Sequence, residues 1–339
     1  MAGLCAAARA RELGAEVRLY EKGDRPGGSM LLSSCVVWRY RSLADFREEC
    51  PGGDPALQAQ VIERLDEGLD WLRSLGAPVV WEETGNPRTV GLRFDPRGLT
   101  EALLRAAGDP ILQGADCSLE EPLILATGGF QGDPELVARY VTPEPVALRA
   151  NPWSAGDGLR LGLGRGGALS AGMDEFYGRN MPARPFTEEE FVPLAQLYGR
   201  WARVVNERGE EFHGDVSWSE NDLVQATARQ PGARAWYLVG EEALERRIRD
   251  RSVRELVEAS GTAIPSRELP FAAPEPLAVH VQASITHTIG GLRIDERARV
   301  ADGVWAAGAD AGGISAGGYA SGLAAALVFG RIAAEDATE

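Results

Sequence analysis

The first 28 residues of this 339-residue chain constrain its fold more than any other stretch. Small and apolar residues on one face, with arginines outside it, predict a helix over residues 4–13 that ends at Gly14. Residues 15–20 then alternate as a strand does, and the strand ends in Glu21. A helix followed by a strand that ends in an acid is typical of the second half of a dinucleotide-binding βαβ unit. In such a unit the carboxylate accepts hydrogen bonds from a ribose.

The glycine fingerprint of such a unit, G-x-G-x-x-G after a strand, is incomplete here, because only Gly3 is present. If Gly3 is the third glycine, Glu21 lies about twenty residues further on, where the ribose-binding acid belongs. We therefore expect the first strand and two phosphate-facing glycines to lie before Met1, so that the chain is truncated at its start. The alternative for this stretch alone is an ordinary buried, alanine-rich helix.

Composition excludes several classes of function. The chain has 35 basic against 50 acidic residues and a net charge of −15, whereas nucleic acids and anionic membranes require a basic surface. Cys5, Cys35, Cys50 and Cys117 show no C-x-x-C spacing, which predicts reduced thiols in a cytoplasmic protein without a metal site. The uncharged run at 311–330 is too rich in Gly, Ala and Ser to predict a membrane span.

Two later stretches place glycines after strand-like runs. The apolar run at 122–130 ends in Thr-Gly-Gly, which is typical of a buried parallel strand whose carboxyl end meets a ligand; a plain strand–turn junction is the alternative. Residues 303–310 predict a strand, and the glycine-rich loop 312–322 leads into a helix over 323–334. A glycine loop at a helix N-terminus presents free N–H groups to an anion or to an electron-rich ring.

The middle of the chain differs in composition. From residue 151 to about 265, aromatic and charged residues become frequent, which predicts an inserted second domain. Within it, residues 241–260 predict one strongly charged helix that faces solvent. An amphipathic pattern over 57–75 predicts a further helix in the first part of the chain.

Four motifs in this order resemble the FAD-dependent fumarate reductase and succinate dehydrogenase flavoprotein superfamily, which also contains the 3-ketosteroid dehydrogenases. These motifs are the Gly3/Glu21 half-fingerprint, Ala126-Thr127-Gly128-Gly129, His287-Thr288-x-Gly290-Gly291, and Ala306-Ala307-Gly308 with its glycine loop. Segments 156–158 and 206–212 match two further family segments. The resemblance covers almost the whole chain.

The resemblance implies an α/β fold. A discontinuous, Rossmann-like FAD/NAD(P)-binding domain would comprise residues 1–150 and 266–339, with an inserted α+β cap domain at 151–265. It also implies an FAD-dependent oxidoreductase that acts on CH–CH bonds and moves a hydride between flavin and a small organic acid, enoate or ketone. The expected partner is this small-molecule substrate, and the sequence does not identify an electron donor or acceptor.

The resemblance also implies roles for individual residues. His287 would face the substrate, with a structural histidine as the alternative, and Tyr319 is a candidate proton-transfer group with a packing role as its alternative. Asp310 would reach the ribityl chain. The expected cofactor-binding residues are Gly3, Glu21, Lys22, Gly27, Gly28, Ser29, Ala126, Thr127, Gly128, Gly129, Gly308, Asp310, Ser321, Gly322 and Leu323.

The chain departs from the family pattern in ways that bear on the substrate. No arginine lies between Gly312 and Gly330, and Glu211 stands where the family has an arginine before Phe212. Because a dicarboxylate needs guanidinium groups to bind its charges, fumarate and succinate are disfavoured. Cys35 stands where a glycine is usual, and the stretch 110–121 is short for the family.

Two other functions stay open at this point. A truncated member of the family could be non-catalytic and bind flavin weakly or not at all. An NAD(P)-linked reductase would need a second glycine-rich fingerprint, and the sequence has none.

Overall fold

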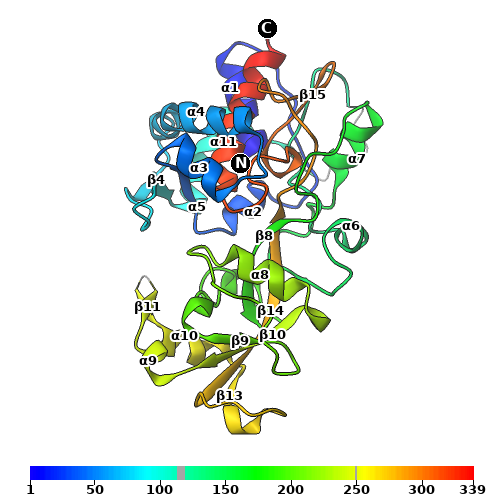
Figure 1. Ribbon diagram of the computed structural model, residues 1–339. Helices are drawn as coiled ribbons and strands as arrows, with labels where there is room; N and C mark the ends of the chain where they lie inside the picture. The colour runs from blue at the N-terminus through cyan, green and yellow to red at the C-terminus, as the bar shows by residue number, and fades with distance from the viewer. Residues whose placement is uncertain (113–118, 249) are drawn as a thin grey trace. The chain divides into compact units, whose positions relative to one another are not determined.

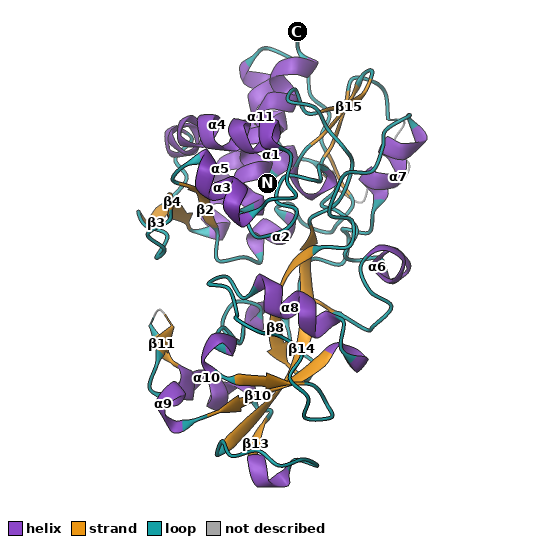
Figure 2. Cartoon of the chain, viewed as in Figure 1, coloured by secondary structure: helices purple, strands orange, loops and turns teal. Residues whose placement is uncertain are grey.

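The computed structural model describes residues 1–112, 119–248 and 250–339, and it divides the chain into two compact units (Figure 1). The larger unit comprises Met1–Leu136, Ala150–Phe176 and His287–Glu339, and the smaller comprises Val137–Arg149 and Tyr177–Thr286. The larger unit is rich in helices, whereas long strands prevail in the smaller one (Figure 2). The mixed α/β fold expected from the sequence is confirmed.

The division differs from the expected boundaries at 151 and 265. Helix α7 (Asp157–Gly164) belongs to the larger unit because its glycines permit close contacts there. A Cβ atom on Gly158 would lie 2.6 Å from the Asp310 carboxylate, and one on Gly162 would lie 2.3 Å from Leu292. Strand β14 (Leu277–Thr288) runs almost wholly in the smaller unit.

The core of the larger unit is the contact between α1 (Ala2–Glu12) and α11 (Gly322–Ala337). Small residues allow the two backbones to approach closely, since a Cβ on Gly330 would lie 2.7 Å from the carbonyl oxygen of Ala2. Helix α5 (Pro96–Ala107) packs on α1, and α4 (Pro55–Ser74), capped by Asp54, packs on α11. The short helices of this unit include α2 (Gly28–Leu31), α3 (Leu43–Glu49) and η5 (Gly308–Asp310).

Parallel strands of the larger unit lie in two separate sheets. Strand β1 (Tyr20–Glu21) pairs with β5 (Ile111–Leu112), and β6 (Leu123–Leu125) pairs with β16 (Val304–Ala306), which also pairs antiparallel with β15 (Arg299–Ala301). The strand expected over 15–20 is therefore shorter than predicted, because only its end finds a partner among the described residues. A third sheet has the order β2 (Val36–Tyr40), β4 (Thr89–Phe94) and β3 (Val79–Trp81).

The smaller unit is built on a six-stranded sheet around β14. Its strands are β13 (Ala263–Pro265), β14, β10 (Arg234–Val239) and β9 (Arg203–Val205), with β7 (Ala147–Leu148) and β8 (Phe176–Pro182) also paired to β14. Helix α8 (Asn221–Ala228) packs on β10. The remaining helices outside 241–260 are α6 (Pro134–Tyr140), η1 (Glu188–Glu190), η2 (Gly199–Trp201), η3 (Pro231–Ala233) and η4 (Ser266–Glu268).

The prediction of one helix over 241–260 was wrong. The structure has α9 (Glu241–Leu244), then the strand pair β11 (Arg247–Ile248) and β12 (Arg251–Ser252), and finally α10 (Val253–Ser260). The physical reason is a capping box, in which the Ser252 side chain accepts from the N–H of Glu255 and the Glu255 carboxylate accepts from the N–H of Ser252. This pair starts a new helix within the charged segment.

We predict that Gly330→Ala lowers the free energy of unfolding by about 1–3 kcal/mol, because the added methyl group must push apart the backbones of α1 and α11. Gly164→Ala is the matched control, since nothing lies within 4 Å of a Cβ at that helical position. Urea denaturation of both variants measures the difference. Equal midpoints for the two variants would show that the α1–α11 contact is looser than described.

Candidate flavin site

The helix and strand at the start of the chain lead to the carboxylate of Glu21, one oxygen of which has no hydrogen-bond partner among the described residues. Glu21 closes β1, and its Oε1 accepts from the N–H of Gly23 at 2.8 Å. Its Oε2 has no hydrogen-bond partner in residues 1–112, 119–248 and 250–339. The side chain is half-buried. This oxygen can therefore accept from a ribose hydroxyl, as the sequence predicts.

Lys22, which was also predicted to bind the cofactor, forms an ion pair with Asp157, and its contact with the cofactor stays a prediction. Its Nζ lies 2.6 Å from the Asp157 Oδ2 at the start of α7. Both side chains are substantially exposed, so this ion pair contributes little to stability. The pair links the start of α7 to the turn after Glu21.

The turn Gly27–Ser29 is held by a residue that the sequence did not single out. Asn151 is buried, and its Nδ2 donates to the Ser29 Oγ at 2.9 Å. Its Oδ1 accepts from the N–H groups of Trp153 and Ser154 at 3.1 Å each. Asn151 thus connects the turn at residues 151–154 to the start of α2. The Asn-Pro pair at 151–152 was the available signal, since it marks a turn.

Helix α1 begins at the carboxyl ends of β6 and β16. A Cβ on Gly3 would lie 3.4 Å from that of Ala126, which follows β6. A Cβ on Gly308, directly beyond β16, would lie 3.0 Å from that of Ala2. The start of a helix at the carboxyl ends of parallel strands is the place where α/β sheets bind dinucleotides.

The turn after β6 is fixed by Asp310, which lies in η5 just beyond the neighbouring strand β16. The fully buried carboxylate accepts from the N–H of Thr127, from that of Gly129 at 3.2 Å and from that of Gly128 at 3.3 Å. It also accepts from the Thr127 hydroxyl at 3.0 Å. Burial raises the pKa of Asp310, and the hydrogen bonds from Thr127 oppose that rise.

Asp310 therefore holds this turn through its carboxylate, and its expected contact with the ribityl chain stays a prediction. The same bonds occupy the N–H groups of Thr127, Gly128 and Gly129, so those groups are not free donors for a nucleotide. Gly128 and Gly129 have φ values of +99° and +85°, which side chains rarely adopt. The turn demands glycine, and its contact with the cofactor stays a prediction.

His287 lies against the start of α11. Its Nδ1 lies 3.2 Å from the carbonyl oxygen of Thr288, an arrangement in which Nδ1–H donates and the neutral ring keeps a lone pair on Nε2. A Cβ on Gly322 would lie only 2.8 Å from that Nε2. Burial lowers the pKa of His287, so the neutral form is favoured.

A second unpredicted residue positions the strand that carries His287. Arg149 is buried, and its guanidinium donates to the carbonyl oxygen of Phe191 and to the hydroxyl of Thr286, the latter at 2.8 Å. Its N–H also donates to the carbonyl oxygen of Ile285 at 2.8 Å. Arg149 therefore fixes the two residues immediately before His287. Nothing in the local sequence distinguishes it from a surface arginine.

The N-terminus of α11 offers the donors that the sequence predicts. The Ser321 hydroxyl caps the helix by accepting from the N–H of Ala324 at 3.3 Å. Within the described ranges, the N–H groups of Gly322 and Leu323 have no acceptor. These two donors stand at the positive end of a 16-residue helix.

Tyr319 precedes this helix in an aromatic group. Its carbonyl oxygen accepts from the Tyr40 hydroxyl at 2.6 Å, and its ring lies 5.4 Å from that of Trp38. Trp38 contacts Tyr40 in turn, edge to face at 5.3 Å. The catalytic role of Tyr319 stays a prediction, and this packing is the alternative stated for it.

The thiols at Cys5, Cys35 and Cys50 are free and buried, and burial raises the pKa of each to about 12. Cys35 adopts a φ of +53°, which accounts for the glycine usual at that position. Cys117 and most of the short stretch 110–121 lie outside the described residues. No helix among those described is long and apolar enough to cross a membrane.

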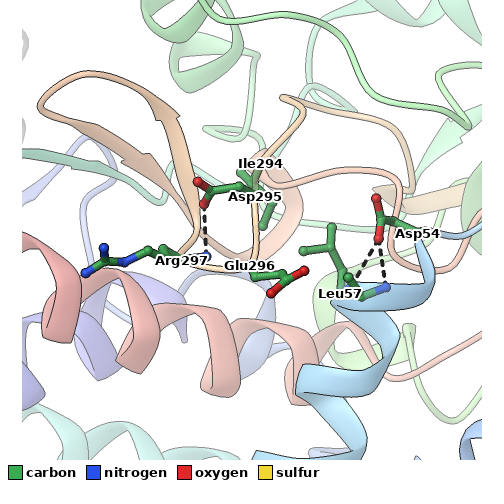
Figure 3. A pocket seen from close by; sticks show the side chains of 7 residues that line it. Asp54, Leu57, Ile294, Asp295, Glu296 and Arg297 are labelled. Carbon is green, nitrogen blue, oxygen red and sulfur yellow. Dashed lines mark hydrogen bonds between the residues drawn. The ribbon is translucent and has the colours of Figure 1, made fainter.

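A surface pocket elsewhere in the larger unit carries none of the predicted site residues (Figure 3). Asp54, at the start of α4, and Asp295 both line it. Asp54 uses its carboxylate to cap α4, and Asp295 accepts from the N–H groups of Arg297 and Arg299. These two carboxylates of the pocket therefore stabilise the local backbone.

Comparison with known proteins decides the family. A family model described as an FAD binding domain matches residues 114–323. The chain belongs to this FAD-binding family. A second model, described as an NAD(P)-binding Rossmann-like domain, matches residues 1–34 and confirms the interpretation of the first stretch. The cofactor is FAD, and the chain is an FAD-dependent oxidoreductase.

Relatives of this FAD-binding protein include a fumarate reductase (cytochrome) from Shewanella frigidimarina, 24% identical over 100% of the chain and 75% of the relative. An NADH:fumarate oxidoreductase from Klebsiella pneumoniae is 23% identical over 100% of the chain and 46% of its own length. A 3-ketosteroid dehydrogenase structure from Rhodococcus jostii has a TM-score of 0.70 at 16% identity, covering 100% of this chain and 95% of that one. A flavocytochrome fumarate reductase structure has a TM-score of 0.71 at 21% identity, covering 99% and 76%. These two structures share the fold.

The residues of this chain fit both ends of the FAD molecule, its adenosine ribose and its flavin ring. Glu21 Oε2 is free to bind the adenosine ribose, and the N–H groups of Gly322 and Leu323 are free to bind the electron-rich edge of the flavin ring. No protein group competes with the cofactor for these three positions among the residues described.

We predict that Glu21→Gln weakens FAD binding about tenfold or more, because a charge-assisted hydrogen bond to the ribose becomes a neutral one. Glu16→Gln, an exposed change five positions earlier, is the control and keeps wild-type affinity. Titration of the apoprotein with FAD, followed by flavin fluorescence, measures the dissociation constants. Equal affinities in the two variants would place the ribose away from Glu21.

Proposed function

We propose that this protein moves a hydride between FAD and a carbon–carbon bond next to the carbonyl of a small organic acid, enoate or ketone. The observation that carries the proposal is the position of His287. Its Nε2 lies against Gly322, at the start of helix α11, and the first N–H groups of that helix suit the flavin ring. Bound FAD would supply the hydride chemistry. The protein would supply the group that accepts or donates the proton.

His287 would handle the proton at Nε2. In the tautomer in which Nδ1–H donates to the Thr288 carbonyl oxygen, Nε2 carries the lone pair of the ring. With its pKa lowered by burial, the ring is neutral at physiological pH and can take a proton from a carbon next to the carbonyl. In the reducing direction the same atom would return the proton.

The substrate class follows from the groups near the final glycine loop. Three relatives are fumarate reductases by name, and two structural neighbours are 3-ketosteroid dehydrogenases. The glycine loop and the first turns of α11, residues 312–330, contain no arginine, and Tyr319 packs there against the ring of Trp38. This favours a neutral carbonyl compound over a dicarboxylate, whose two charges need guanidinium partners.

We predict that His287→Gln keeps flavin bound but lowers turnover about 100-fold or more, because the proton acceptor is lost. His280→Gln is the control: that histidine pairs with Glu207 and stacks on Trp236, and its loss leaves turnover close to wild type. Flavin content and turnover per bound flavin are measured together. Loss of flavin with unchanged turnover per flavin would make His287 structural.

The pH profile gives a separate prediction. In the oxidising direction, wild-type kcat falls only below His287's ordinary pKa of 6.5, because burial lowers that pKa and protonation removes the acceptor. The acidic limb disappears in His287→Gln. A limb that persists in the variant would belong to another group.

The substrate class is tested by re-oxidation of the reduced flavoprotein with a panel of enones, enoates and fumarate. We expect re-oxidation by neutral enones to be fastest and that by fumarate to be slowest. Preference for fumarate would contradict the substrate assignment but not the hydride chemistry. A protein that binds FAD and reacts with none of them would support the non-catalytic alternative.

A further inference from the structure

The smaller unit contains a buried acid in an unusual setting. Glu220 precedes α8 and is only 5% exposed, and its φ of +55° is one that side chains rarely adopt. Left-handed backbone at a non-glycine residue costs about 1 kcal/mol. Burial of a carboxyl adds a further cost. A glycine or asparagine would avoid both costs, so the retained glutamate points to a use for the carboxyl group.

One oxygen of Glu220 is bonded and the other is not. Oε2 accepts from the N–H of Gly199 at 3.1 Å, which ties the start of α8 to η2. Oε1 has no hydrogen-bond partner within the described part of the chain. The Nε of Arg200 lies 3.9 Å from it, and that arginine is 39% exposed. A cation able to reach the carboxylate therefore already stands at the protein surface.

The other groups that face Glu220 are mostly engaged. Arg179, on β8, donates to the carbonyl oxygen of Ser219 at 2.6 Å. Tyr198, beside η2, donates to the Gln196 Oε1, and Tyr237, on β10, accepts from the Asn180 Nδ2 at 2.8 Å. Both tyrosines are fully buried, and a Cβ on Gly199 would lie 3.0 Å from the Tyr237 hydroxyl and 3.2 Å from the Glu220 Oε2.

A second carboxylate pins the same loop independently. Asp222, on α8, accepts from the N–H and the hydroxyl of Ser217 and from the His213 Nε2 at 2.9 Å. These hydrogen bonds outweigh burial and lower the pKa of Asp222. Burial, opposed by Gly199, Arg179 and Arg200, raises the pKa of Glu220 to about 7. Of the two carboxyls, only Glu220 changes charge in the neutral range.

We propose that Glu220 is a proton-controlled latch between η2 and the start of α8. In its neutral form the carboxyl stays buried and holds the N–H of Gly199. When the proton leaves for solvent, the carboxylate turns toward Arg200 and water, its backbone relaxes, and the segment 218–220 between Ser217 and α8 loosens. Asp222 keeps its hold on Ser217, so α8 itself stays folded. The device belongs to the smaller unit and does not require bound flavin.

The sign of the stability change follows from the pKa. A carboxyl whose pKa rises from 4.5 to about 7 on folding binds its proton more tightly in the folded state. Its contribution is complete at acidic pH and is lost as the pH rises from 4.5 to 7. The equilibrium that opens the latch therefore shifts by about two orders of magnitude across this interval at most.

Hydrogen exchange tests the latch in the whole protein. Exchange is compared at about pH 6 and about pH 8.5, on either side of the carboxyl's pKa of about 7, after correction for the intrinsic rate. In the wild type, protection of peptides covering 198–202 and 218–221 falls about tenfold at the higher pH. Glu220→Gln abolishes this difference. Glu258→Gln, an exposed change on α10, keeps it.

Equal protection at both pH values in the wild type, or a difference that survives in Glu220→Gln, would overturn the proposal. A measurement without any variant covers the case in which Glu220→Gln does not fold. Carbon-13 NMR of the labelled wild-type carboxyl groups should show one buried glutamate that titrates near 7. Absence of any such titration, with every glutamate ionised below about pH 5.5, would equally overturn it.

Discussion

The larger unit depends on one buried carboxylate. Asp310 gathers three consecutive N–H groups at the end of β6 and so joins that strand to η5 beyond β16. The Thr127 hydroxyl extends the network, because it accepts from the N–H of Gly158 at 2.9 Å and thereby fixes the start of α7. The carbonyl oxygen of Asp310 accepts from the N–H of Leu292 at 2.7 Å, which anchors the segment after His287. Three distant parts of the chain are thus joined through the Asp310 backbone and side chain and the Thr127 hydroxyl.

Near Asp310, some polar atoms have no hydrogen-bond partner within the described protein, whereas others are bonded within it. Buried polar groups in folded proteins are almost always paired. Glu21 Oε2 and the N–H groups of Gly322 and Leu323 have no hydrogen-bond partner among the described residues, whereas the donors of Thr127–Gly129 are used internally. The free atoms follow strands or begin a helix, where backbone geometry leaves groups without partners. The chemistry of the chain is concentrated in these few atoms.

Patterns that depend on near neighbours could be predicted from the sequence. The helix over 57–75, the helix after the glycine loop and the dinucleotide-binding half-unit all follow from local periodicity, and FAD followed from motif order. Contacts across long separations could not be predicted: the hydrogen bonds from Thr127 and Gly129 to Asp310 join residues more than 180 positions apart. Asn151 and Arg149 were missed for the same reason. The capping box at Ser252 was visible but was overlooked in favour of charge periodicity.

The first stretch and the start of α11, with the turn held by Asp310, are expected to form the FAD site of this chain. The visible absorption spectrum of the purified protein, recorded after incubation with FAD and removal of free cofactor, tests this site. We expect a bound-flavin spectrum at one FAD per chain, because the acceptor on Glu21 and the donors on α11 are already in place. A colourless protein that gains no flavin spectrum would contradict it.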